Sequence, residues 1–479
     1  MLEKVYRLRS SPFFIVVVAF VLRLVIVGFL YQDQLKPRLD HMSFGYETGR
    51  IARAIASGRG FSDPVIKGGG PTALMPPVYP YLVAGVFKLS GIFTPTSAVI
   101  LLSLNSLFSA LTCVPVFLMA RESFGQKTAI WAAWAWALFP HAILLSTDLI
   151  WETCLTTLLL SVLFLMTLRL ERSTALTAWA GFGLLWGVTA LSNPAVLSLL
   201  PFLAGWACYR LHRRGRRWGG QAVVALLALA VVVSPWFVRN YMTFHRFIPF
   251  RDGFWLEMHV GNNGDTSNWA GRAHPGDSVS EDQDFRRMGE LNYMAAKRRQ
   301  TMEFIRGHPG WFAWRTVRRI VHLWTGYWRF PAKGRIEVAF DPDLPFDPTI
   351  IGLFTTLTIL AIAGLWRAFA QRAPVAWPYA FVMLFFPLVY YVTHSELRFR
   401  HPIDPMLVVL ATFACVNFLS PERKKSTFHD RPVAQDTAAL AHRRVAEDGT
   451  AALGSPIRLR SGSYTGLALS PAIIQLLND

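Results

Sequence analysis

Long apolar runs alternate with short polar connections over most of the chain. The runs cover residues 12–31, 98–119, 128–146, 149–168, 176–192, 195–209, 221–238, 349–366, 375–393 and 403–419. Most are close to the ~20 residues that a helix needs to cross a bilayer. A transmembrane β-barrel would instead show short segments of alternating polarity. The pattern therefore predicts an all-α polytopic membrane protein with about 10–12 transmembrane helices.

Three further segments have helical patterns but are not typical spans. Residues 77–93 form a shorter apolar stretch flanked by prolines, which favours a juxtamembrane or interfacial helix. Residues 43–57 form a polar helix in the first loop. In residues 310–328, aromatic and β-branched residues alternate with arginine, a pattern typical of a helix that lies at the membrane surface.

The basic residues decide the orientation. The formal net charge is +18, and arginine and lysine cluster beside the apolar runs, most densely at 210–217. With the N-terminus in the cytoplasm, every short cytoplasmic loop is basic. These loops are 121–127, 169–173, 210–217, 366–372 and the start of the C-terminal tail at Arg423. The positive-inside rule therefore selects this topology in a plasma (inner) membrane. No nucleic-acid-binding module accompanies the charge.

This topology divides the chain into a membrane domain, residues 1–420, and a C-terminal tail, residues 421–479. Two long loops face the non-cytoplasmic side, at 32–76 and 239–348. The second is rich in Trp, Asn, Gly, Asp and Arg and predicts a small helical subdomain. The tail has little periodicity and predicts disorder in the cytoplasm.

Ionisable residues gather at the outer ends of the predicted spans, where an exposed charge at membrane depth is costly and functional by default. The candidates are Asp40, Glu47, Asp148, Glu152, Arg239, Arg398 and Arg400. Arginine binds phosphate oxygens in bidentate geometry, and a carboxylate can take a proton from an attacking hydroxyl. The mixed set predicts transfer of a group from a lipid phosphate at the outer membrane boundary.

Each candidate also has a purely structural explanation. Asp40 and Asp148 could cap the helices that follow them. Glu47 could pair with Arg50, Glu152 could pair with an arginine, and the three arginines could anchor the interface. His394 and His401 lack zinc-like spacing. The carboxylate-rich site could hold a divalent cation, although no ligand spacing requires one.

The order of motifs resembles the integral-membrane glycosyltransferases of the C-type fold. The segments that carry the resemblance are "LDHMSFGYETGRIARAIASGRGF", "MPPVYPYLVAGVFKLSG", "SPWFVRNY" and "LRFRHPIDPMLVVLA". The nearest branch is family 39, which includes the protein O-mannosyltransferases and the lipid A aminoarabinose transferases. The resemblance covers roughly residues 10 to 420.

The resemblance implies a polyprenyl-phosphate sugar as donor and a protein, lipid or glycan acceptor. It places Asp40 at the position of the catalytic base, and Asp148 or Glu152 at a second acidic position. Arg398 and Arg400 match a basic segment, and Tyr79 lies in the family's Pro-Pro-x-Tyr-Pro motif, which makes it a substrate-binding candidate. Two departures stand out. Met75 occupies the place of a phosphate-binding lysine, and His41 replaces the acid that usually follows the aspartate.

The sequence therefore predicts an inverting glycosyltransferase with Asp40 as base. Two alternatives remain. A lipid or oligosaccharide flippase would need polar groups through the bilayer, often at broken helices near the midplane. A polymerase or ligase of surface polysaccharide would join preassembled lipid-linked chains instead of single sugars.

Overall fold

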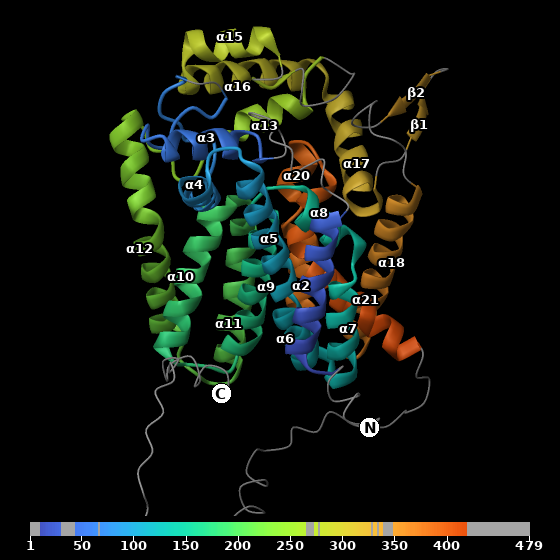
Figure 1. Cartoon of the computed structure of the whole chain (residues 1–479). Helices are drawn as coiled ribbons and strands as arrows, with labels where there is room; N and C mark the ends of the chain where they lie inside the picture. Colours follow the sequence, from blue (N-terminus) through green and yellow to red (C-terminus); the bar gives the residue numbers. More distant parts are fainter. Residues whose placement is uncertain are drawn as a thin grey trace, which may run out of the picture. The chain divides into compact units, whose positions relative to one another are not determined.

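The computed structural model describes residues 10–29, 44–65, 68–264, 273–275, 278–326, 329–332, 335–338 and 348–418. Asp40 and the tail from 421 lie outside the described residues. The described part is almost entirely helical (Figure 1). The predicted all-α architecture is confirmed.

Ten apolar helical segments match the ten predicted runs one by one. They are α2 (Pro12–Phe29), α5–α6 (Pro95–Leu111 and Cys113–Phe124), α7–α8 (Gln126–Ala137 and Pro140–Asp148), α9 (Thr153–Leu170), α10 (Leu176–Ser192), η2–α11 (Pro194–Leu199 and Leu200–Arg213), α12 (Gly219–Phe244), α18 (Pro348–Ala370), α19–α20 (Ala376–Phe385 and Leu388–Val392) and η3–η4–α21 (Leu397–Phe399, His401–Ile403 and Asp404–Phe418).

Not all ten segments are long enough to cross a membrane unaided. Among the described residues, seven helices have the required length and apolarity, and the bent pair α7–α8 makes up to eight. The two remaining segments, 176–192 and 376–392, are apolar but shorter. The chain is therefore an integral, multi-pass membrane protein.

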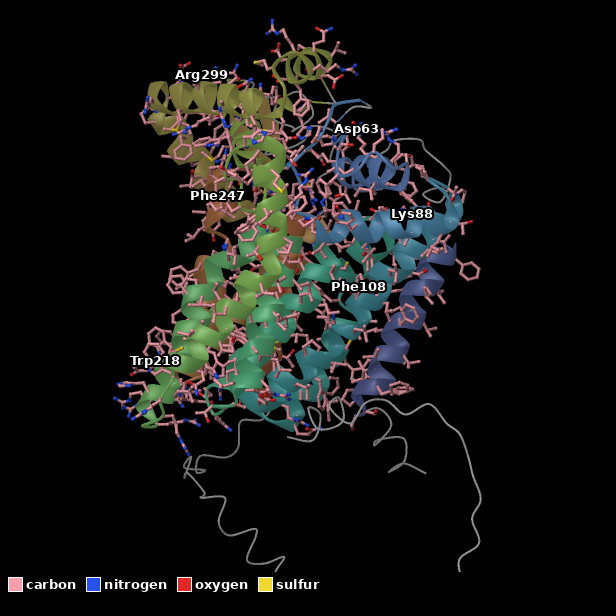
Figure 2. All side chains as sticks on the ribbon, turned by 90° about the vertical axis from the view of Figure 1, so that its left-hand side faces the viewer. Asp63, Lys88, Phe108, Trp218, Phe247 and Arg299 are labelled. Atoms are coloured by element: carbon pink, nitrogen blue, oxygen red, sulfur yellow. The ribbon has the colours of Figure 1, made fainter. Side chains whose placement is uncertain are left out.

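The remaining elements lie at one end of the apolar helices. They are α3 (Glu47–Ala56), α4 (Val78–Ser90), α13 (Phe254–Gly261), α15 (Val279–Met288), α16 (Glu290–Gly307), α17 (Pro309–Thr325) and the antiparallel hairpin β1 (Arg329–Ala332) and β2 (Arg335–Val338). Figure 1 shows α15 and α16 across this end, above α3 and α13. In Figure 2, Asp63 and Arg299 lie at this end and Trp218 at the opposite one.

The opposite end is held by ion pairs between the predicted basic loops. Glu171, which follows α9, contacts Arg210 at 2.8 Å and Arg214 at 3.1 Å, and it also contacts Arg172. We call this the basic end of the helix bundle, and the end with α3, α13 and α16 the cavity end.

Small residues let neighbouring helices approach closely. Gly183 and Gly187, four residues apart on α10, face α12. A Cβ at Gly183 would overlap the Ala225 carbonyl, and one at Gly187 would lie 2.6 Å from the Val232 Cβ. Such close approach is a common packing mode of membrane helices, because van der Waals contact replaces the hydrophobic driving force.

Helix α17 covers the residues predicted to form a surface helix, and its Arg319 has a structural role. Arg319 is fully buried and donates hydrogen bonds to the carbonyl oxygens of Gly261, Tyr391 and Val392. The exposed side chains of α17 include Trp314 and Val317 instead. Arg319 thus fastens the helix to the cavity end, and apolar residues form much of its outer face.

Candidate active site

A cavity of about 380 Å³ lies at the cavity end. Its wall comes from six separate parts of the sequence: Tyr46 and Glu47 at the start of α3, Met75–Pro76, residues 151–153 before and at the start of α9, residues 192–195, a group within 249–260 together with His274, and a group within 389–402. Aromatic side chains occur all around it, including Trp151, Phe250, Phe254, Tyr390 and Phe399. The cavity can therefore accept a ligand with an apolar part.

Eight ionisable side chains line the same cavity. They are Glu47, Glu152, Glu257 and Glu396, with Arg251, Arg398, His274 and His394. The structure thus brings together Glu47, Glu152 and Arg398, three of the residues predicted to bind substrate, from distant parts of the chain.

A continuous series of polar contacts follows one side of the cavity. Arg251 Nη2 lies 2.7 Å from Glu257 Oε1, and His394 Nδ1 lies 3.5 Å from Glu257 Oε2. His394 Nε2 is also 3.5 Å from Glu396 Oε1, and Glu396 pairs with Arg398. Two arginines therefore lie at the ends of one chain of contacts, and each is paired with a glutamate.

The contacts with Arg251 and Arg398 keep Glu257 and Glu396 ionised although both carboxylates are buried. Burial alone would raise the pKa of Glu257, but the charges of Arg251, His394 and His274 outweigh it, so the pKa falls below its ordinary value. Burial also opposes ionisation of Glu396, yet Arg398 and His394 lower its pKa strongly. Both glutamates are therefore carboxylates at neutral pH.

A second pair lies on the α3 side. His274 Nε2 is 2.9 Å from Glu47 Oε1, and the rings of His274 and Tyr46 meet edge-on at 5.5 Å. Burial disfavours the charged imidazole, but the hydrogen bond to Glu47 and the charges of Glu47 and Glu257 raise the pKa of His274 above its ordinary value.

The two candidates for the second acid differ in their surroundings. Glu152 lines the cavity, and its buried Oε2 has no hydrogen-bond partner in the described part of the chain. The neighbouring Trp151 supports Arg398, whose guanidinium lies 3.8 Å from the Trp151 ring centroid. Asp148 ends α8 and is not among the lining residues. Glu152 is thus the better placed of the two.

Three other predicted residues also lie outside the cavity wall. Arg239 donates to the Thr72 and Phe61 carbonyls at 2.7 and 2.8 Å and so holds the end of the first loop. Tyr79 is buried and donates to Asn105 Oδ1 at 2.9 Å. Arg400 is fully buried in an ion pair with Asp404. The sequence predicts that these three side chains contact substrate. In the structure, each of them contacts other parts of the protein.

The sequence analysis did not identify Arg251, Glu257 or His274. They lie in the long second loop, where no apolar run fixes their depth or orientation. The one available signal is local: Arg251 and Glu257 flank the aromatic stretch "GFW" in a region otherwise remote from any span end.

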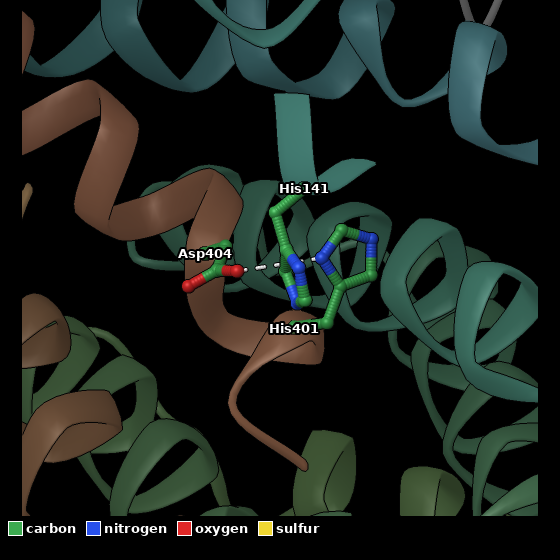
Figure 3. A group of neighbouring side chains, drawn as sticks. All are labelled: His141, His401 and Asp404. Atoms are coloured by element: carbon green, nitrogen blue, oxygen red, sulfur yellow. Dashed lines mark hydrogen bonds and ion pairs between the residues drawn. The ribbon is translucent and has the colours of Figure 1, made fainter. Parts of the chain in front are cut away.

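A buried cluster under the cavity contains His141, His401 and Asp404 (Figure 3). Their ligand atoms lie within 4.8 Å of one another, a spacing that a metal ion could use. However, Asp404 already pairs with Arg400 at 2.8 Å. A divalent ion would place two further positive charges beside the buried Arg400 guanidinium, so the donor set fits a metal poorly.

Comparison with known proteins finds a family similarity in the middle of the chain. Residues 75–238 match the model of the dolichyl-phosphate-mannose-protein mannosyltransferase family. The predicted family resemblance is confirmed. The mannosyltransferase-like segment supplies Met75, Pro76 and Trp151 to Thr153, and also residues 192–195, to the cavity wall. No curated protein matches the chain.

Solved structures resemble the whole bundle at low sequence identity. The oligosaccharyltransferase of Archaeoglobus fulgidus, tethered with an acceptor peptide, aligns with a TM-score of 0.50 and 16% identity, over 91% of this chain and 53% of its own. ArnT from Cupriavidus metallidurans, bound to undecaprenyl phosphate, aligns with a TM-score of 0.45 and 16% identity, over 90% and 64%. This chain spans about half the length of the archaeal enzyme. The fold likeness to that enzyme confirms the predicted C-type glycosyltransferase-like fold.

Proposed function

We propose that the protein is an inverting glycosyltransferase that moves a sugar from a polyprenyl-phosphate donor to an acceptor at the non-cytoplasmic membrane face. One observation supports this most strongly. Arg251 and Arg398 lie on the wall of a single cavity that also has aromatic walls and carboxylates. The arginines suit a phosphate, the aromatic walls suit an apolar chain, and the carboxylates suit a hydroxyl that loses its proton.

In this proposal, Arg251 and Arg398 bind the donor phosphate, and Asp40 is the base. The acceptor hydroxyl oxygen attacks the anomeric carbon, its proton passes to the Asp40 carboxylate, and the bond from the anomeric carbon to the phosphate oxygen breaks. The lipid phosphate leaves with the bonding electrons, and the arginines offset its charge. Attack from the face opposite the phosphate inverts the anomeric centre.

The proposed location is the plasma (inner) membrane. The basic end of the bundle then faces the cytoplasm under the positive-inside rule, which puts the cavity on the other side. Glu152 is proposed as the second functional acid near the donor. The acceptor, whether protein, lipid or glycan, would approach from the side of α3 and α16.

A transfer assay with Asp40→Asn tests the central step. Purified protein is incubated with a panel of polyprenyl-phosphate sugars and acceptors, and products are identified by mass spectrometry. Asp40→Asn is expected to lose transfer by at least about 100-fold, as for removal of a general base. Asp33→Asn, in the same loop, is the matched control and should keep activity.

Transfer retained in Asp40→Asn would remove Asp40 from the mechanism. Products longer than one added sugar would favour a polysaccharide polymerase or ligase. Lipid flux in liposomes without any covalent product would favour a flippase.

A divalent cation is a separate part of the proposal. Glu47 and Glu152 both line the cavity and offer the oxygen ligands that Mg²⁺ prefers. Activity lost on dialysis against EDTA and restored by Mg²⁺ or Mn²⁺ would support it. Full activity in EDTA would exclude it.

A further inference from the structure

The first outer loop folds back on itself before it reaches the cavity. Residues 61–65 and 68–74 make up this segment, which we call the strap. Asp63, labelled in Figure 2, donates its backbone N–H to the Gly70 carbonyl at 3.0 Å, and its Oδ1 accepts from Gly70 N at 3.3 Å. The strap leads directly into Met75–Pro76, which line the cavity. The position of the strap therefore sets one part of the cavity wall.

Three other parts of the chain hold the end of the strap. The buried Glu290, which begins α16, accepts from Ala73 N at 2.6 Å with Oε1 and from Thr72 Oγ1 with Oε2. Arg239, on α12, donates to the Thr72 carbonyl at 2.7 Å. Asp252 N, just before α13, donates to the Ala73 carbonyl at 3.0 Å. Both backbone groups of Ala73 are thus occupied, one by Glu290 and one by the segment that leads into α13.

Arg251, which lines the cavity, lies beside the strap. A Cβ added at Gly253 would lie 2.6 Å from Arg251 Nη2 and 2.9 Å from Leu74 Cδ1. The guanidinium and the buried Leu74 side chain therefore both pack closely against the Gly253 backbone. From this position Arg251 Nη2 reaches Glu257 Oε1 at 2.7 Å. The orientation of the guanidinium thus depends on where Leu74 and the Gly253 backbone lie.

Glu290 acts on both of these groups through one residue. Its bond to Ala73 N fixes the residue before Leu74, and the Ala73 carbonyl fixes Asp252, the residue between Arg251 and Gly253. Loss of the carboxylate would leave the Ala73 N–H without this acceptor, and an unpaired buried donor costs about 1–3 kcal/mol. The strap would then move to find another partner, and the segment bonded to it would move as well.

We propose that Glu290 is a positioning residue for Arg251 and that it acts through Ala73, by way of the Asp252 backbone and the packing of Leu74 against Gly253. Glu290 is not one of the residues that line the cavity. Its function is to hold the strap so that the Arg251 guanidinium stays directed at Glu257. The phosphate-binding consequence rests on the proposed function, whereas the positioning itself does not.

Hydrogen exchange of the full-length protein in detergent tests the positioning directly. Glu290→Leu removes both acceptor oxygens at similar size, and Glu290→Gln keeps an acceptor for Ala73 N. We expect amide exchange in residues 72–74 and 251–253 to quicken by at least about 10-fold in Glu290→Leu and by much less in Glu290→Gln. Glu303→Leu, the same change at an exposed position of α16, is the matched control and should leave both segments unchanged.

If Glu290→Leu loses order throughout, Thr72→Val provides the test. It keeps the side-chain shape and removes the hydroxyl that contacts Glu290, whereas Thr72→Ser keeps that hydroxyl and is its control. The same local increase in exchange is expected in Thr72→Val alone. Unchanged exchange in residues 251–253, in whichever variant folds, would overturn the proposal even if residues 72–74 exchange faster.

Binding of a C55 polyprenyl phosphate, measured by native mass spectrometry, supplies the second measurement. Glu290→Leu should weaken binding about 10-fold in the wild-type background and have no further effect when Arg251 is Gln. Glu290→Gln should restore most of the loss. An equal loss in both backgrounds would contradict positioning through Arg251. If Arg251→Gln itself changes nothing, the proposed phosphate site loses this residue, and the exchange result alone decides the role of Glu290.

Discussion

His274 Nε2 lies 2.9 Å from Glu47 Oε1, and both side chains are largely buried. This pair joins two loops that are more than 200 residues apart in the sequence, at the wall of the cavity. Glu47 opens α3, the helix that follows the first loop, and its carboxylate favours the helix N-terminus as well as the imidazolium. The position of the first loop therefore depends on the second.

Replacement of Glu47 by Gln should reveal this dependence through pH. The pKa of His274 is raised in the folded state, so the stabilising contribution is complete below the ordinary histidine pKa and is lost as pH rises through the folded pKa. At pH 6 we expect Glu47→Gln to lower the free energy of unfolding by about 1.5–3 kcal/mol, as for a hydrogen bond to a charged group. At pH 9 the difference should be smaller.

Thermal unfolding of wild type and variant at both pH values checks this prediction. Asp284→Asn, which removes an exposed ion pair with Arg287 in the same region, is the control and should have little effect. An equal loss of stability at pH 6 and pH 9 would show that the Glu47–His274 charge interaction is not responsible.

Arg398 should be more sensitive to substitution than its charge alone would indicate. Its guanidinium lies over the Trp151 ring and pairs with Glu396, so Lys would keep the charge but lose the planar contact with Trp151 and the fork of N–H donors that suits a phosphate. Polyprenyl-phosphate binding should weaken about 10-fold in Arg398→Lys and up to about 100-fold in Arg398→Gln. Arg210→Gln, at the basic end, serves as control in the same titration. Unaltered binding in Arg398→Gln would exclude this residue as a phosphate ligand.

Glu290 should make the stability of the cavity end fall as pH rises. Its carboxylate accepts hydrogen bonds from Ala73 N at 2.6 Å and from Thr72 Oγ1, so it holds the loop that leads to Met75. Burial and the nearby charge of Asp252 raise the pKa of Glu290 to about 8, and burial raises the pKa of Asp252 to about 6. Folding therefore favours the protonated forms, and stability should fall as pH rises from 4.5 to about 8.

Glu290→Gln keeps an acceptor for Ala73 and removes the titration, so it should flatten the decline in unfolding temperature between pH 5 and pH 9. Glu303→Gln, at an exposed position of the same helix, should leave the wild-type profile unchanged. A profile as steep in Glu290→Gln as in wild type would assign the pH dependence to other groups.

The ten apolar runs predict the helices because a bilayer imposes length and composition on each span independently. The shorter helix predicted at residues 77–93 also follows from its apolar pattern, as α4 shows. The role of the α17 arginines could not be predicted, since an arginine that binds backbone carbonyls and one at a lipid surface have the same spacing. Only the partners, here residues 261 and 391–392, distinguish them.

The cavity shows the same division. Glu47, Glu152 and Arg398 follow from their place at span ends, where charge is costly. Arg251 and His274 do not, because a long loop has no periodic pattern that sets depth. Arg400 lies at the same span end as Arg398, yet its side chain is buried inside the helix bundle. The two arginines are only two residues apart in a 3₁₀ segment, and the turn of that segment decides which of them lines the cavity. The spacing of apolar residues does not predict this.

The contact between α10 and α12 provides a test of the fold that is independent of function. Gly183→Ala should destabilise the protein by about 1–3 kcal/mol, because the added methyl overlaps the Ala225 carbonyl and backbone cannot yield as a flexible side chain can. Gly181→Ala, two residues away on the same helix, meets only the Met166 methyl at 3.9 Å and should be neutral or stabilising by up to about 1 kcal/mol through helix propensity. Unfolding temperatures of the two variants in detergent, measured in parallel, check the prediction. Equal behaviour of the two alanine variants would mean that α10 and α12 do not pack as closely as Gly183 and Gly187 allow.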